Sequence, residues 1–112
     1  MENGGMPTTT KTDEVIRTAI QQKRLAKVTY LGRVRIVEPH DYGVQNGTVK
    51  LLTYQLTGAS SGPLPNWRWI QVDSISEIEL LDRTFRGGRP SPSGKHHTWD
   101  ELYLRVAPPD DD

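Results

Sequence analysis

The chain has 112 residues, of which 34% are hydrophobic, and its formal net charge at pH 7 is zero. This length fits one domain with a single modest core, and zero net charge excludes a protein held to nucleic acid by bulk charge alone. The absence of cysteine excludes disulfides, thiolate metal ligands and a thiol nucleophile.

The chain begins with a Gly/Thr-rich segment and then shows a helical pattern. We expect residues 1–11 to be disordered. A Thr-x-x-Asp pattern at Thr10 and Asp13 is typical of a capping box and favours a helix over residues 12–23. Apolar residues recur in that segment at helical spacing, so the helix has one face that must dock on another element. We see no signal peptide and no long apolar run, and therefore expect a soluble, cytoplasmic protein with no membrane partner.

The middle of the chain predicts β-structure. Alternating side chains predict strands over residues 25–32 and 33–39, a hairpin centred on Asn46-Gly47, a strand containing Arg68, and a last strand over residues 75–81. Pro39 should end its strand or form a bulge. One helix and about five short strands favour a small, highly curved barrel.

The stretch PNWRWIQVDSI, residues 65–75, places a cation among aliphatic residues. Side chains alternate across a strand, so Trp67 and Trp69 share one face, whereas Arg68 shares the other with Ile70. Arg68 therefore either caps the rim of the core or lines a pocket that accepts negative charge. We expect the two tryptophans to pack under the helix or under the C-terminal segment.

Residues 87–112 read as a Gly/Pro/Ser-rich extension with an acidic end. The apolar segment 99–106 is expected to form one or two helical turns that pack back on the body. His96 and His97 are adjacent in a flexible stretch, which gives no fixed ligand geometry, so we expect no metal site. RGGRP, residues 86–90, is typical of a flexible turn. The signatures of common enzymes are missing, so we expect no catalytic residue, no cofactor and no enzymatic activity.

The ordered set of motifs in the middle of the chain resembles the WYL domain. The matching pieces are VTYLG (28–32), RIVEP (35–39), VKLLTY (49–54) and RWIQVDSI (68–75), and Phe85 stands where that family commonly places a closing phenylalanine. The family's namesake Trp-Tyr-Leu would fall on Val49, Lys50 and Leu51, so only the leucine is kept. The chain also leaves no room for the helix-turn-helix that most WYL proteins carry. It is more similar to a short, stand-alone bacterial subgroup.

The resemblance implies a helix plus an SH3/Sm-like β-barrel of about five strands over residues 12–86, and a role in ligand sensing or transcriptional regulation. It places Tyr30, Arg35, Tyr54 and Arg68 at the positions that line the family's proposed ligand site. Two arginines can grip a phosphate or carboxylate with forked hydrogen bonds, while tyrosines add hydroxyl donors and stacking faces. His40, next to Pro39, is expected to add one donor to the rim.

Two functions are therefore open. The first is a non-enzymatic module whose Arg/Tyr pocket binds a nucleotide-like or other anionic small ligand, or single-stranded nucleic acid. The second is a protein–protein interaction module, such as a homodimer, that uses the barrel edge and the face of Trp67 and Trp69. The residues alone also allow a purely structural reading, in which Arg68 pairs with Glu38 or Asp73 and the tyrosines form the barrel wall.

Overall fold

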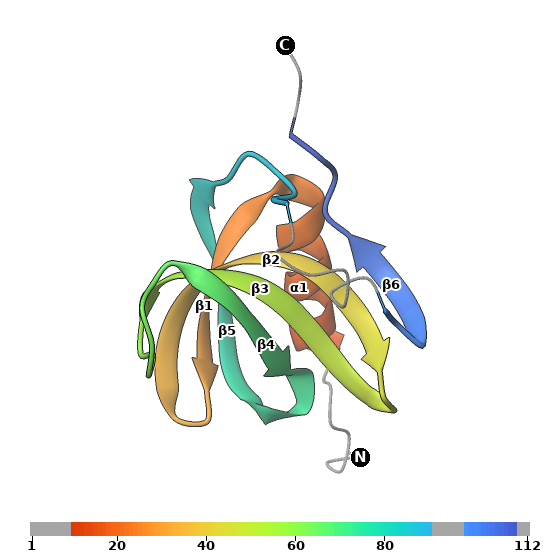
Figure 1. Ribbon diagram of the computed structural model, residues 1–112, viewed down its shortest axis with the longest axis horizontal. Helices are drawn as coiled ribbons and strands as arrows, with labels where there is room; N and C mark the ends of the chain where they lie inside the picture. Colours follow the sequence, from red (N-terminus) through yellow and green to blue (C-terminus); the bar gives the residue numbers. More distant parts are fainter. Residues whose placement is uncertain (1–9, 91–97, 110–112) are drawn as a thin grey trace.

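The structure, a computed structural model, describes residues 10–90 and 98–109. Within them an N-terminal helix is followed by strands that form one antiparallel sheet (Figure 1). The elements are α1 (Thr10–Gln22), β1 (Arg24–Tyr30), β2 (Arg33–Gln45), β3 (Thr48–Gly58), β4 (Asn66–Gln71), the 3-10 helix η1 (Val72–Ser74), β5 (Ile75–Thr84) and β6 (Glu101–Arg105). The expected class, mostly β with an N-terminal helix, is confirmed. Residues 1–9, expected to be disordered, and His96 and His97 lie outside the described residues.

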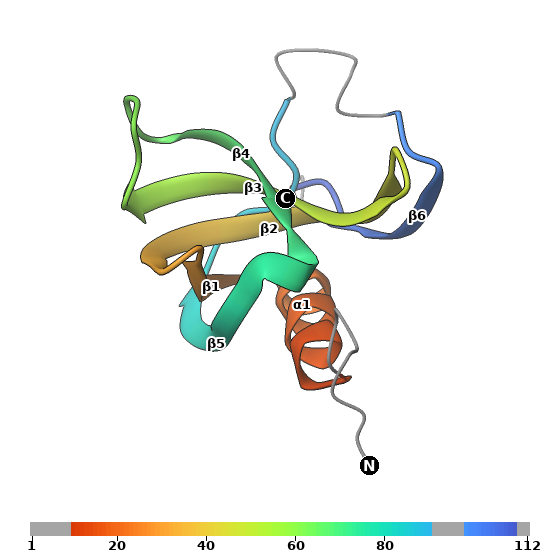
Figure 2. The same cartoon turned by 90° about the horizontal axis from the view of Figure 1, so that it is seen from below.

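The sheet is strongly curved but does not close. Its strand order is β4-β3-β2-β1-β5, and β6 pairs with β2 beside that path (Figure 2). The first half of β2 pairs with β1 and the second half pairs with β6. On its other edge, β2 pairs with β3 along nearly the whole length of β2. The register between β2 and β3 shifts between Pro39 and Asp41, so Pro39 sits at a bulge, where its missing N–H is tolerated. A closed barrel is not confirmed.

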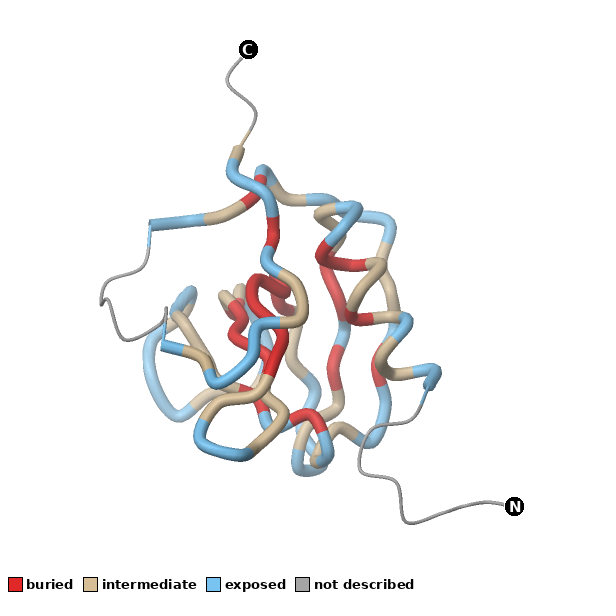
Figure 3. Tube along the Cα trace, turned by 90° about the vertical axis from the view of Figure 1, so that its right-hand side faces the viewer, coloured by how far each residue is buried: buried red, intermediate tan, exposed pale blue. Residues whose placement is uncertain are grey.

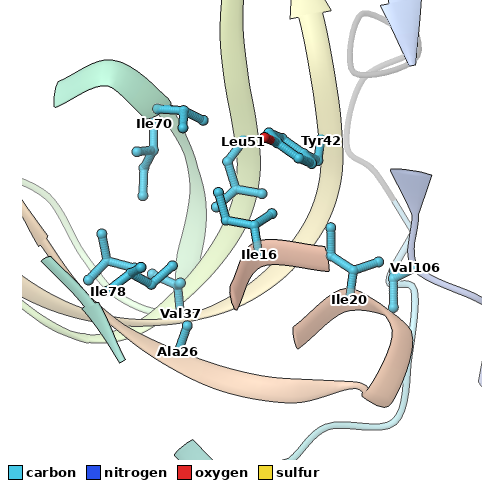
Figure 4. Packing of buried hydrophobic residues seen from close by; sticks show 11 residues of the cluster. Ile16, Ile20, Ala26, Val37, Tyr42, Leu51, Ile70, Ile78 and Val106 are labelled. Atoms are coloured by element: carbon cyan, nitrogen blue, oxygen red, sulfur yellow. The ribbon is translucent and has the colours of Figure 1, made fainter. Parts of the chain in front are cut away.

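The core lies between the inner, concave face of the sheet and α1. Ile16 and Ile20 of the helix are buried against inward-facing residues of the strands (Figure 4). The tube in Figure 3 shows buried positions along the strands and on one side of the helix. Members of the core cluster are Ile16, Ile20, Ala26, Val28, Val37, Tyr42, Leu51, Ile70, Val72, Ile78 and Val106. The amphipathic face predicted for the helix is thus the face that closes one end of the curved sheet.

The C-terminal segment forms a strand instead of the expected helical turns. β6 pairs with the second half of β2, and backbone bonds from Asp100 N to Val44 O and from Val106 N to His40 O continue this pairing beyond the strand ends. A Cβ on Gly43 would come within 2.2 Å of Glu101 O, so the close approach of β6 requires a glycine there. The free edge of β2 provides backbone hydrogen-bond partners for residues 101–105. These bonds stabilise a strand more than the helical spacing of a short apolar run favours a helix.

Candidate functional site

The five site residues predicted from the sequence lie on two faces of the sheet. Tyr30, Arg35 and Arg68 are on the inner face, whereas Tyr54 and His40 are on the outer face. Strand register shows this division: Arg35 pairs across β1 with the buried core residue Val28. Tyr54 instead aligns with Glu38 on β2 and with Trp67 on β4. The predicted residues therefore belong to two separate clusters.

The inner-face residues gather at the end of the curved sheet that lies away from α1. The turn between β1 and β2 and the loop between β3 and β4 both lie at this end (Figure 2). We call the group Tyr30, Arg35, Gln55, Ser60 and Arg68 the mouth cluster. The backbone bond from Ala59 N to Val34 O, 3.0 Å long, holds the loop against β2 and so fixes the entrance.

Arg35 is held by neutral groups. Its Nη1 donates to Gln55 Oε1 at 3.3 Å, and its Cζ lies 5.3 Å from the centre of the Tyr30 ring. Its Nε is buried and has no hydrogen-bond acceptor in the part of the chain that the structure describes. Gln55 is itself fully buried, and its Nε2 donates to the carbonyls of Thr57 and Ala59. Arg35 thus carries a charge that no described carboxylate balances.

Arg68, on β4, also forms hydrogen bonds only with neutral groups among the described residues. Its Nη2 donates to Ser60 Oγ at 2.7 Å and its Nη1 to the backbone oxygen of Trp67 at 2.9 Å. It does not pair with Glu38 or Asp73, the two carboxylates that the structural reading assigned to it. Because Thr53 aligns with Arg68 and Val37 with Gln55, Gln55 lies diagonally between the two arginines on the same face.

The mouth cluster has the chemistry of an anion site with an apolar border. The two guanidinium groups can donate to phosphate or carboxylate oxygens, while Gln55, whose amide N–H groups already bond the carbonyls of Thr57 and Ala59, positions Arg35 through its Oε1. The Tyr30 hydroxyl accepts the backbone N–H of Gln71 at 3.2 Å, so its own proton can be donated. Beside the cluster, Leu31 and Val34 are 66% and 44% exposed, which offers contact to an apolar part of a ligand.

The outer-face residues belong to a different group, the outer cluster, formed by Glu38, His40, Tyr54, Trp67 and Arg89. The Glu38 and His40 side chains are only 3% and 4% exposed, and His40 Nε2 lies 3.2 Å from Glu38 Oε1. The Trp67 ring meets His40 and Tyr54 edge-on, with centroids 4.9 and 5.4 Å apart. The Phe85 ring stacks on His40, with centroids 5.5 Å apart.

Arg89 balances the charge of Glu38. Its Nε and Nη2 donate to the two carboxylate oxygens at 2.7 and 2.8 Å, and its Cζ lies 4.2 Å from the centre of the Tyr54 ring. Burial by itself raises the pKa of Glu38, but the hydrogen bonds from Arg89 and His40 outweigh it and hold that pKa below its usual value. Sequence reasoning missed this pair because the RGGRP segment reads as a turn and its partner lies 51 residues away.

The remaining predicted surfaces are also occupied in part. Trp69 packs against Trp99 with ring centroids 5.4 Å apart, so the expected packing of a strand tryptophan on the C-terminal segment is seen for Trp69, whereas the Trp67 ring contacts His40 and Tyr54. In residues 10–90 and 98–109, no helix is long and apolar enough to cross a membrane, and no three His, Cys, Asp or Glu side chains group as metal ligands.

Comparisons with family models, curated proteins and solved structures find no match to this chain.

Proposed function

We propose that the protein is a non-enzymatic binding module that holds a nucleotide-like or other anionic ligand in the mouth cluster. The observation that carries the proposal is that Arg35 and Arg68 share one face and bond only neutral groups among the described residues. Cations in a partly buried site cost free energy when no negative charge is near. An anion that accepts forked hydrogen bonds from both side chains would remove that cost.

The fold assigned in this proposal is a WYL-like, SH3/Sm-like barrel that stays open. A helix closing one end of a curved antiparallel sheet agrees with the motif order that resembles the WYL domain. The proposal keeps Tyr30, Arg35 and Arg68 from the site that the resemblance implies, and adds Gln55 and Ser60. Tyr54 and His40 are left out of it because they are on the opposite face.

A thermal-shift screen of nucleotides, short single-stranded oligonucleotides and small anions tests the proposal, since a ligand of the native state raises the melting temperature. We expect binding that weakens with added salt and falls at least about tenfold in Arg35→Ala and Arg68→Ala. The matched control is Arg83→Ala, which removes an exposed arginine of β5 and should leave the affinity unchanged. The proposal fails if no compound shifts the melting temperature, or if both mouth variants bind like the wild-type protein.

A second candidate function is self-association through a sheet edge. Among the described strands, β4 and β5 each pair on one side only, and an open edge can accept a strand from another chain. Trp69 contributes less than expected to such a surface because it packs on Trp99. Light scattering at several protein concentrations tests this candidate: a mass that stays that of one chain contradicts it.

A further inference from the structure

The outer cluster holds the buried carboxylate of Glu38 among aromatic and imidazole rings that come mainly from the sheet. Glu38, Tyr54 and Trp67 form one row across β2, β3 and β4. His40, from the bulge in β2, closes the row by contacting both the carboxylate of Glu38 and the ring of Trp67. Glu38, Tyr54 and Trp67 therefore keep their places through strand pairing, whereas His40 also contacts Phe85, the first residue after β5.

The guanidinium group bound to the Glu38 carboxylate comes from a segment outside the sheet. Arg89 lies after β5, and its side chain is 43% exposed while that of Glu38 is 3% exposed. The carboxylate is thus at the bottom, and the guanidinium enters from the solvent side. Beside it is a surface cavity of about 200 Å³, so Arg89 is open to solvent on this side. Residues lining the cavity are Arg86, Gly87, Gly88, Arg89, Pro90 and Pro109.

The geometry selects a guanidinium over other cations. Two parallel N–H donors match the two oxygens of Glu38 at 2.7 and 2.8 Å, and an ammonium group cannot make this planar fork. The flat face of the same group lies against Tyr54, 4.2 Å from the ring centre, which adds a cation–π contact. A carboxylate this deeply buried is costly without a cation beside it.

We infer that the outer cluster is a guanidinium-binding site and that Arg89 is its built-in occupant, which an arginine side chain of another protein segment can replace. This site is on the opposite face from the mouth cluster and has the opposite charge preference, so it does not depend on the anion-binding proposal. Tyr54 and His40, which the sequence assigned to an anion pocket, serve here as walls for a cation.

The test empties the site and refills it. In full-length Arg89→Ala, N-acetylarginine amide and the peptide FRGGRP, which copies residues 85–90, should raise the melting temperature by several degrees in a saturable way. N-acetyllysine amide and the peptide FKGGKP, in which both arginines are replaced by lysine, should bind at least about tenfold more weakly, because they lack the fork. In the wild-type protein the arginine compounds must displace Arg89, so they should act only at concentrations at least about tenfold higher. No response at any concentration would show that another arginine cannot replace Arg89.

Two further variants make the result decisive. Glu38→Gln combined with Arg89→Ala removes the carboxylate and should abolish the response, and Arg83→Ala, which removes an arginine outside the cluster, should not create one. If Arg89→Ala alone does not fold, the same titration is followed by circular dichroism, and N-acetylarginine amide should restore the folded signal. The inference is overturned if the arginine compounds neither stabilise nor refold this variant, or if the lysine compounds act equally well.

Discussion

The hydroxyl of Tyr42 donates a 2.6 Å hydrogen bond to Asp13 Oδ1, and this bond joins the centre of β2 to the first turn of α1. Tyr42 is only 1% exposed and belongs to the core cluster. Arg17 donates to the same carboxylate and lies over the rings of Tyr42 and Tyr103. The docking of the helix on the sheet therefore combines apolar packing with a partly buried hydrogen bond.

Replacing Tyr42 with Phe should weaken this docking. The change removes a hydrogen bond to a charged group without leaving a cavity, so we expect the free energy of unfolding to fall by about 1.5–3 kcal/mol. Urea denaturation measures it. Tyr103→Phe is the matched control, because no hydrogen bond of its hydroxyl is seen among the described residues. Equal losses in the two variants would contradict a specific role for the Tyr42 hydroxyl.

The same residue should give the protein a characteristic loss of stability in alkali. Burial, and then the hydrogen bond to Asp13, raise the pKa of Tyr42 well above its ordinary value of 10. Above pH 10 the unfolded chain ionises this phenol while the folded chain does not, so stability falls as pH rises through that range. The stability difference between the wild-type protein and Tyr42→Phe should therefore shrink from pH 9 to pH 11 in urea titrations. A difference that stays constant would show that Tyr42 titrates alike in both states.

Glu38 should make the protein sensitive to acid. Burial raises its pKa, but the hydrogen bonds from Arg89 and His40 outweigh burial, so the folded-state pKa is below the ordinary 4.5. The stabilisation is therefore present above about pH 4.5 and is lost as pH falls through the folded-state pKa. The wild-type protein should lose stability more steeply below this pH than Glu38→Gln does. Asp13, whose pKa is also lowered, will keep some acid sensitivity in the variant; parallel curves would rule out the role of Glu38.

The sequence predicted the elements better than the faces on which their side chains lie. Asn46-Gly47 gave the correct hairpin, and alternation placed Arg68 on the inner face beside Ile70. In β3, however, Leu51 and Leu52 are both buried, one on each side of the sheet. Because both faces are covered, the apolar pattern alone does not tell which side of β3 is the inner one. Tyr54 is grouped with the two arginines through the resemblance to the WYL domain, and it lies on the other face of the sheet.

The segments that pack on the outer face of the sheet are held by contacts between residues far apart in the sequence. Arg89 reaches Glu38 across 51 residues and Arg105 reaches Asp41 across 64. No local pattern reports such pairs, since a single carboxylate or arginine in a strand or loop looks like an ordinary surface residue. Arg68, by contrast, is singled out by a local signal, a cation that alternates with aliphatic residues within one strand, whereas Arg35 is assigned through the resemblance to the WYL domain.

The turn between β1 and β2, beside the mouth cluster, has nearly the same backbone conformation as the turn between β2 and β3. The β1–β2 turn has positive φ at Leu31 (51°) and Gly32 (77°), and the β2–β3 turn has nearly the same values at Asn46 (52°) and Gly47 (76°). Asparagine adopts this conformation more easily than leucine, and Leu31 is 66% exposed, so it buries little. Leu31→Asn should therefore raise the free energy of unfolding by about 0.5–1 kcal/mol, and Asn46→Leu should lower it by a similar amount, as measured in urea. A loss of stability in Leu31→Asn would show that the leucine packs on something in the folded protein.

A substitution of Arg35 should change ligand binding with little change in stability, more clearly than a substitution of any other residue of the mouth cluster. Its Nε is buried without an acceptor in the described chain, and its one side-chain bond, to Gln55 Oε1, is 3.3 Å long. Arg35→Met keeps most of the side-chain volume and removes an unbalanced charge, at the expense of that weak bond. We therefore expect a free energy of unfolding within about 0.5 kcal/mol of the wild-type value and a loss of the anion binding found in the thermal-shift screen.

The matched substitution Arg105→Met should behave in the opposite way. Arg105 donates two hydrogen bonds, of 3.1 and 3.2 Å, to the buried carboxylate of Asp41. Its removal leaves that charge unpaired and should cost about 2 kcal/mol, less than a fully buried pair because Arg105 is partly exposed, while anion binding is kept. Urea denaturation and the thermal-shift titration together separate the two arginines. If Arg35→Met lost as much stability as Arg105→Met, Arg35 would be a structural residue, and the mouth cluster would lose its main support as a binding site.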